Sequence, residues 1–165
     1  MGNPFAYYRI GSARDLKHSP RHAVRDLDWD RDLEMIRSFY ARFSDRPVDP
    51  GEFGPEVGNP VAVVIGGSIA SFAIPLSFHA GETEIGGAAT VPEMRSKGYC
   101  KDLISVLALR ILDEGKAATL TTEKTNLPMR KAAEAIGMRL LPEERQPEGA
   151  AADDAADREE DEKCP

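Results

Sequence analysis

Apolar residues recur at helical spacing between Trp29 and Phe43, which is the first long pattern in the chain. The positions that share this spacing are Leu33, Ile36, Phe39, Tyr40 and Phe43. Steps of three and four predict an amphipathic helix over Trp29–Phe43. A short apolar run at Ala6–Ile10 predicts a strand before it, and the prolines and glycines crowded into Ser44–Pro60 predict an irregular loop after it.

Two β-rich runs, Val61–Ile65 and Ile69–Leu76, flank the glycine turn Gly66-Gly67-Ser68. Such runs joined by a tight turn predict a hairpin. A further strand, the third of this region, is expected at Thr83–Val91. The pair Gly86-Gly87 inside this strand indicates either a β-bulge or a flexible strand beside small core residues.

The pattern returns to helical period from Tyr99 to Gly115, and a strand is expected next at Ala117–Thr122. A third helix is expected from the N-cap Asn126 to Gly137, and a last strand at Met138–Leu141. This order predicts a layered α/β (α+β) domain. Its sheet is mixed and mostly antiparallel, with about six to seven strands and helices on both faces.

The composition sets the limits of this domain. A chain of 165 residues with 41% hydrophobic residues suits one domain, which we expect to span residues 1–142. Residues 143–165 are rich in acids and carry hardly an apolar side chain larger than alanine towards their end. We interpret this segment as a disordered acidic tail.

Charge and cysteine content narrow the classes of partner. The net charge of −7, from 28 acids and 21 bases without a basic stripe, argues against nucleic acid. No apolar run reaches the length of a membrane span, and the first residues lack a signal-peptide core. Cys100 and Cys164 stand far apart in neither a disulfide framework nor a metal spacing. We therefore expect a cytoplasmic protein that binds no membrane and no metal.

One stretch carries recognisable chemistry, from Glu84 to Cys100. A predicted strand there runs into a basic glycine turn, Arg95–Cys100, and then into a helix. Backbone N–H groups at the start of a helix lack partners within the helix, and the helix dipole adds about half a positive charge. The turn is therefore a candidate site for a pyrophosphate.

These residues resemble motifs of the GCN5-related N-acetyltransferase (GNAT) superfamily. The family's pyrophosphate signature Gln/Arg-x-x-Gly-x-Gly/Ala is similar to Arg95-Ser96-Lys97-Gly98-Tyr99-Cys100, and its frequent strand ending to Thr90-Val91-Pro92-Glu93-Met94. The segment from Asn126 to Met138 is similar to the family motif Asn-x-x-Ala/Ser-x-x-Leu-Tyr-x-x-x-Gly-Phe. Together the resemblance covers Glu84–Met138, about a third of the chain.

The resemblance implies an acetyl-CoA-dependent N-acetyltransferase that needs no metal. Its acceptor would be a primary amine of a small molecule or peptide, and a homodimer is compatible with it. The pantetheine arm would lie between two splayed strands, and the phosphates on the loop amides. The implied coenzyme-binding residues are Ala88, Ala89, Thr90, Val91, Arg95, Ser96, Lys97, Gly98, Tyr99, Cys100 and Asn126. For Asn126, capping the helix is an alternative or additional role.

The chain departs from the family at its general acid. A tyrosine that protonates the leaving thiolate commonly stands seven residues after the asparagine, where this chain has Ala133. Glu84 stands where several members place a general base, although it could equally be a solvent-facing strand carboxylate. His79, Tyr40 and Glu34 are alternative acceptor-side groups or ordinary surface and core residues.

Two further functions stay open. The missing acid motivates a CoA or acyl-CoA-binding regulatory module with little catalysis. The other alternative is an interaction protein whose acidic tail and Pro/Gly-rich loop dock a partner, with a vestigial coenzyme site. The acceptor itself is not readable from the sequence, because the first helix and the Ser44–Pro60 loop match no motif.

Overall fold

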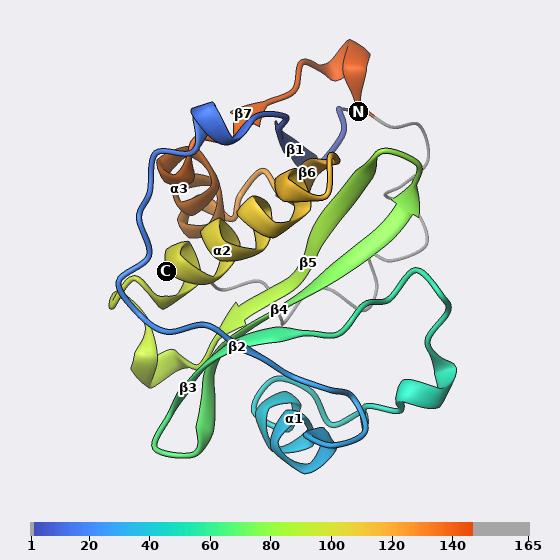
Figure 1. Cartoon of the computed structure of the whole chain (residues 1–165), viewed down its shortest axis with the longest axis vertical. Coiled ribbons are helices and arrows are strands. Elements are labelled where there is room, and N and C mark those ends of the chain that lie inside the picture. The colour runs from blue at the N-terminus through green and yellow to red at the C-terminus, as the bar shows by residue number, and fades with distance from the viewer. Residues whose placement is uncertain (1, 147–165) are drawn as a thin grey trace.

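The structure is a computed structural model that describes residues 2–146. Within this range the strands form one seven-stranded sheet in the order β2-β3-β4-β5-β6-β1-β7 (Figure 1). The strands are β1 (Phe5–Ile10), β2 (Arg25–Asp26), β3 (Val61–Ile65), β4 (Ser68–His79), β5 (Glu82–Thr90), β6 (Ala117–Glu123) and β7 (Arg139–Leu140). The α-helices are α1 (Leu33–Tyr40), α2 (Tyr99–Asp113) and α3 (Leu127–Ile136).

The sheet is mixed, as the sequence predicts. β5 and β6 pair in parallel, and the other neighbouring strands pair antiparallel. β5 and β6 are parallel because α2 connects them. This helix returns the chain to the end of the sheet where β5 begins. α2 and α3 cover one face and α1 the other (Figure 1), so the predicted helices on both faces are confirmed.

The predicted hairpin is found at the expected residues. β3 and β4 meet at Ile65 and Ser68, and the turn residues Gly66 and Gly67 have φ of 58° and 80°. A two-residue turn with both φ positive matches the right-handed twist of a hairpin and favours glycine at both positions. β4 then runs on to His79, three residues beyond the predicted end at Leu76.

α1 is shorter than the predicted helix. It covers Leu33–Tyr40 rather than Trp29–Phe43, because the Asp28 side chain accepts hydrogen bonds from the amides of Asp30 and Arg31 and so holds a turn before the helix. Trp29 anchors the following loop instead: its ring contacts Phe53 edge-on at 4.7 Å, and its Nε1 donates to the carbonyl of Gly58 at 2.9 Å.

β1 is the second strand from one edge of the sheet, where it lies between β6 and β7 and is antiparallel to both. Its buried residues Ala6, Tyr8 and Ile10 pack in the core beneath α2 and α3. The final strand β7 pairs with β1 alone and is shorter than the predicted Met138–Leu141.

The end of the described chain remains part of the fold. The Gln146 side chain accepts a hydrogen bond from Asn3 Nδ2 at 2.9 Å, and Glu143 forms an ion pair with Lys124 at 3.3 Å. Residues 143–146, which the sequence analysis assigns to the tail, therefore contact the domain. The rest of the predicted tail, residues 147–165 with Cys164, lies outside the described residues.

Candidate coenzyme site

β5 and β6 pair only at their beginnings. Residues 82–84 of β5 face residues 117–119 of β6, and no pairing follows among the described residues, although both strands continue. The later half of β5, from Ile85 to Thr90, therefore has a neighbour on its β4 edge only. The two strands diverge after Glu84, as the resemblance implies.

A bulge interrupts β5 next to this divergence. Phe72 of β4 faces Ala89, whereas Ile74, two residues further, faces Gly86, so β5 carries one extra residue here. Gly87 has a φ of 56°, which favours glycine. Of the two interpretations of Gly86-Gly87, the bulge is confirmed.

The backbone beyond the bulge directs an amide towards β6. The Val91 amide donates to the carbonyl of Ala70 on the β4 side at 2.9 Å. Amides alternate in direction along a strand, so the Ala88 amide points the opposite way, into the region between the diverging strands. Pantetheine amides are groups that could pair there.

The loop before α2 exposes a row of backbone amides. Ser96 has a φ of 63° and Gly98 a φ of 83°, and Gly98 caps the helix without a side-chain hydrogen bond. Among residues 2–146, the amides of Ser96, Lys97, Gly98 and Tyr99 have no hydrogen-bond acceptor. Unpartnered amides at the start of a 15-residue helix form an environment that favours an anion.

The two basic residues of this loop differ in their surroundings. Arg95 Nε donates to the carbonyl of Thr90 at 3.1 Å, and burial lowers the pKa of its guanidinium. Arg95 thus ties the loop to the end of β5. Lys97 is exposed, and its Nζ lies 3.9 Å from the sulfur of Met94. Lys97 is the better placed of the two to approach a ligand from solvent.

The remaining predicted coenzyme residues are partly structural. The side chains of Tyr99 and Cys100 are buried in the core shared with α3. Asn126 Oδ1 accepts a hydrogen bond from the Met129 amide at 3.3 Å, so its capping role is observed. Ala133 is fully buried in the same core and offers no proton donor.

Glu84 lies at the point of divergence, opposite Thr119, and is half-buried. Its neighbour Ile85 packs beneath α2, so Glu84 points to the α1 face. On that face the Tyr40 ring contacts Phe72 at 5.4 Å, and its hydroxyl lies 3.9 Å from the position a Gly87 Cβ would occupy. Glu84 and Tyr40 therefore lie on the same face of the sheet, near the bulge.

The other acceptor-side candidates lie on the surface. Glu34 is exposed on α1, and His79 is exposed at the tip of the β4–β5 hairpin, at the opposite end of β5 from the loop amides. Neither shares the position of Glu84 beside the divergence.

An unpredicted ion pair joins the turn after α1 to the segment before the coenzyme loop. Arg42 NH1 and NH2 donate to the two carboxylate oxygens of Glu93 at 2.9 and 2.8 Å. The hydrogen bonds from Arg42 lower the pKa of Glu93 to about 2. The partners are 51 positions apart in the sequence, so no local pattern could have predicted the pair.

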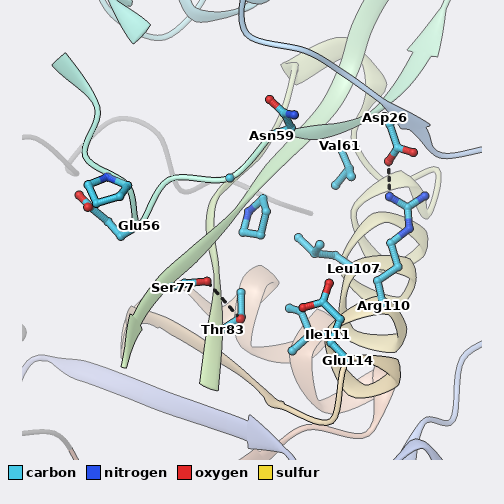
Figure 2. A pocket seen from close by; sticks show the side chains of 13 residues that line it. Asp26, Glu56, Asn59, Val61, Ser77, Thr83, Leu107, Arg110, Ile111 and Glu114 are labelled. Atoms are coloured by element: carbon cyan, nitrogen blue, oxygen red, sulfur yellow. Dashed lines mark hydrogen bonds and ion pairs between the residues drawn. The ribbon is translucent and has the colours of Figure 1, made fainter. Parts of the chain in front are cut away.

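A separate hollow of about 290 Å³ lies between the second half of α2 and strands β3 to β5. Figure 2 shows Leu107 and Ile111 of α2, with Glu114 just after this helix, facing Ser77 and Thr83 of the sheet. The Arg110–Asp26 ion pair lies at one rim. None of the predicted site residues lines it.

Metal-ligand clusters and membrane-spanning helices are both absent from the part of the chain that the structure describes. No group of three or more His, Cys, Asp or Glu side chains within residues 2–146 is arranged to hold a metal ion. None of the helices in this range combines the length and apolar character needed to cross a bilayer.

Comparison with solved structures identifies the fold. A putative GNAT-family acetyltransferase from Novosphingobium aromaticivorans is 19% identical, with a TM-score of 0.67 over 84% of this chain and 60% of the other. A GNAT-family acetyltransferase from Colwellia psychrerythraea is 14% identical, with a TM-score of 0.65 over 82% of this chain and 52% of the other. This chain thus spans little more than half the length of these two proteins.

A third structure, AAC(6')-Iy in complex with the bisubstrate analogue CoA-S-monomethyl-acetylneamine, is 17% identical. Its TM-score is 0.56 over 70% of this chain and 88% of the other. No curated protein sequence matches this chain. The model of the family described as FR47-like protein, which is of the GNAT type, matches residues 73–146, a range that contains β5, the loop amides, α2 and α3. This chain therefore has the fold of the GNAT-family acetyltransferases, and its residues 73–146 match the FR47-like family model.

Proposed function

We propose that this protein transfers an acetyl group from acetyl-CoA to a primary amine of a small molecule or peptide by direct attack. The observation that carries this proposal is the divergence of β5 and β6 together with the unpartnered amides of Ser96–Tyr99 at the start of α2. A gap edged by open backbone and a cluster of amides suits a ligand with an amide-containing arm and a pyrophosphate. Support also comes from AAC(6')-Iy, whose fold is shared and whose bound analogue contains CoA.

In this proposal the chain mainly binds and orients the thioester. The pantetheine arm lies along Ala88–Val91, and the pyrophosphate accepts hydrogen bonds from the loop amides. An inward-pointing amide such as that of Ala88 stabilises the negative charge that develops on the thioester oxygen during attack. Holding both reactants in position makes a covalent enzyme intermediate unnecessary.

For proton transfer, the site offers a candidate base but lacks the acid that many family members use. The acceptor must lose a proton before it attacks, and Glu84 is the carboxylate at the divergence that can accept it, directly or through water. Ala133 supplies no acid for the departing thiolate. A thiolate is a fair leaving group, so the missing acid slows transfer, by about 10²–10⁴-fold for a typical general acid, without abolishing it.

The first test measures binding and turnover in one preparation. Acetyl-CoA is titrated into the protein by calorimetry, and release of free thiol is followed with a panel of amines and peptides. Saturable binding with amine-dependent thiol release is the expected result. No binding of acetyl-CoA at all would overturn the proposal.

The role of Glu84 is tested against a matched carboxylate on the same strand. Glu84→Gln is expected to lower kcat by about 10²-fold or more and to leave acetyl-CoA affinity within a few-fold. Glu82→Gln is the control, because Glu82 lies two residues away on the same face and its carboxylate pairs with Arg9 at 3.3 Å. Equal rates for the two variants would mean that Glu84 is an ordinary strand carboxylate.

A CoA-binding module with little catalysis is the second candidate, and the buried Ala133 favours it. It predicts tight binding of acetyl-CoA and CoA with no thiol release above the uncatalysed rate for any amine. Release that depends on both the amine and Glu84 would exclude it.

A further inference from the structure

A segment far from the family motifs is fastened to the first turns of α2. Residues 18–22, here called the strap, lie between β1 and β2 in the chain, in the segment that runs past the N-terminal end of α2 (Figure 1). Ser105 Oγ donates to the carbonyl of His18 at 3.1 Å. The other hydrogen bonds between the strap and α2, among the described residues, all end on the carboxylate of Asp102.

Asp102 accepts four hydrogen bonds from the strap. His18 Nε2 and His22 Nδ1 each lie 2.5 Å from one of its oxygens, and the amides of Arg21 and His22 donate at 3.1 and 2.9 Å. Only 1% of the residue is exposed. Burial alone would raise the pKa of Asp102, but these hydrogen bonds together outweigh it, and its pKa lies below the ordinary value.

The charge of this cluster is adjustable. A neutral imidazole can donate one N–H to Asp102, so with two neutral rings the cluster carries one negative charge. Each proton added to a ring raises that charge by one. The His18 and His22 side chains are 20% and 36% exposed, so protons can reach them from solvent. Imidazole is the side chain that changes charge between about pH 5 and 8.

The cluster lies next to the proposed phosphate site. The His22 ring meets the ring of Tyr99 edge-on at 4.5 Å, and Tyr99 is the first residue of α2. Asp102 follows Gly98 by four residues, about 6 Å along a helix axis. The titratable groups that meet here are His18 and His22 of the strap with Asp102 and Tyr99 of α2. A negative cluster at this distance opposes an anion, and a neutral or positive one does not.

We propose that the His18–Asp102–His22 cluster holds the first turn of α2 in place and takes up a proton when the coenzyme phosphates bind. This rests on the proposed function, since it assumes that the loop amides receive those phosphates. Affinity for acetyl-CoA then increases as the pH falls, because binding a polyanion favours the protonated cluster. Asp102, His18 and His22 are positioning residues in this scheme.

The test is calorimetric titration with acetyl-CoA at about pH 6, 7 and 8 in buffers of different ionisation enthalpy, which reports the protons taken up on binding. The wild type is compared with the double variant His18→Gln/His22→Gln, in which glutamine amides can still donate to Asp102. His79→Gln is the matched control, because this third histidine lies exposed at the hairpin tip.

The wild type and His79→Gln are expected to take up protons on binding acetyl-CoA. Their gain in affinity from about pH 8 to about pH 6 is expected to exceed the gain of the double variant by about three- to tenfold. The comparison removes the ligand's contribution, since a phosphate monoester also titrates near pH 6. Should the double variant lack a cooperative thermal transition, His22→Gln alone is expected to lose part of the uptake.

A purely structural role for the strap gives a different result. In that case the double variant binds more weakly by one factor at every pH and takes up as many protons as the wild type, and the proposal is wrong. Failure of the proposed function is distinguishable, because then the wild type does not bind acetyl-CoA under any condition.

Discussion

Replacing Gly137 by alanine tests how the N-terminal segment packs against the end of α3. Gly137 has a φ of 106°, and a Cβ at this residue would lie 1.9 Å from the carbonyl oxygen of Asp15. The same contact region contains the hydrogen bond from the Lys17 amide to the Ile136 carbonyl at 3.0 Å. An added methyl group must therefore displace the 13–17 segment or the helix end.

The expected cost has three parts. The left-handed backbone costs an alanine about 1–2 kcal/mol, overpacking about 1–3 kcal/mol, and the strained hydrogen bond about 1 kcal/mol. The reduced entropy of the unfolded chain returns about 0.4–1 kcal/mol. We expect Gly137→Ala to lower the free energy of unfolding by about 3 kcal/mol or more.

Gly115→Ala is the matched control, since Gly115 also follows a helix, has a φ of 79°, and has no atom within 4 Å of the position that a Cβ would occupy. Only backbone strain applies there, so a loss of about 1 kcal/mol is expected. Urea unfolding followed by circular dichroism measures the loss of unfolding free energy in both variants. In thermal unfolding, the Tm of Gly137→Ala should lie roughly 4–8 °C below that of the control. Equal losses would refute the close packing of Asp15 on Gly137.

Three further outcomes follow from the site. Arg42→Gln should raise the pKa of Glu93 from about 2 towards its usual 4.5, measured by NMR titration. Because the folded-state pKa is depressed, the stabilisation of the fold by this ion pair is present above about pH 4.5 and is lost as the pH falls towards 2. An unchanged titration would mean that the pair does not form in solution. Ala133→Tyr should not restore a general acid, because the site is fully buried; thermal unfolding should show a loss of about 1–3 kcal/mol instead, and a faster, stable variant would contradict this. Lys97→Met should weaken acetyl-CoA binding by about fivefold at low salt and by less at high salt, and a loss independent of salt would argue against phosphate contact.

The coenzyme loop shows how far local sequence signals reach. The basic glycine turn before a helical pattern predicted the open amides of Ser96–Tyr99, because backbone direction at a helix start depends only on neighbouring residues. The left-handed conformation of Ser96 had no such signal, since serine does not favour positive φ. The bulge at Gly87 was partly predictable. The two glycines permit either a bulge or a regular strand, and the pairing with β4 decides for the bulge.

Pairings between distant segments could not be predicted. Trp29 continued the helical period of its neighbours, yet its ring packs against Phe53 of the loop and Phe72 of β4, because burial there outweighs one more helical turn. The Asp102 cluster joins residues 80 to 84 positions apart, and a histidine in an irregular segment carries no period that would reveal its partner.

By itself the sequence determined the local elements and the chemistry they can offer: the strand Val61–Ile65 with its glycine turn, the start of α2 at Tyr99, the cap at Asn126, and the amide-rich loop between β5 and α2. These follow from hydrophobic period, turn residues and caps, which act over a few residues. The tertiary structure alone decided that β1 enters the sheet beside β6, that β5 and β6 separate after Glu84, and that the strap meets Asp102. Those arrangements depend on which surfaces bury each other across the whole chain, and no local pattern encodes that choice.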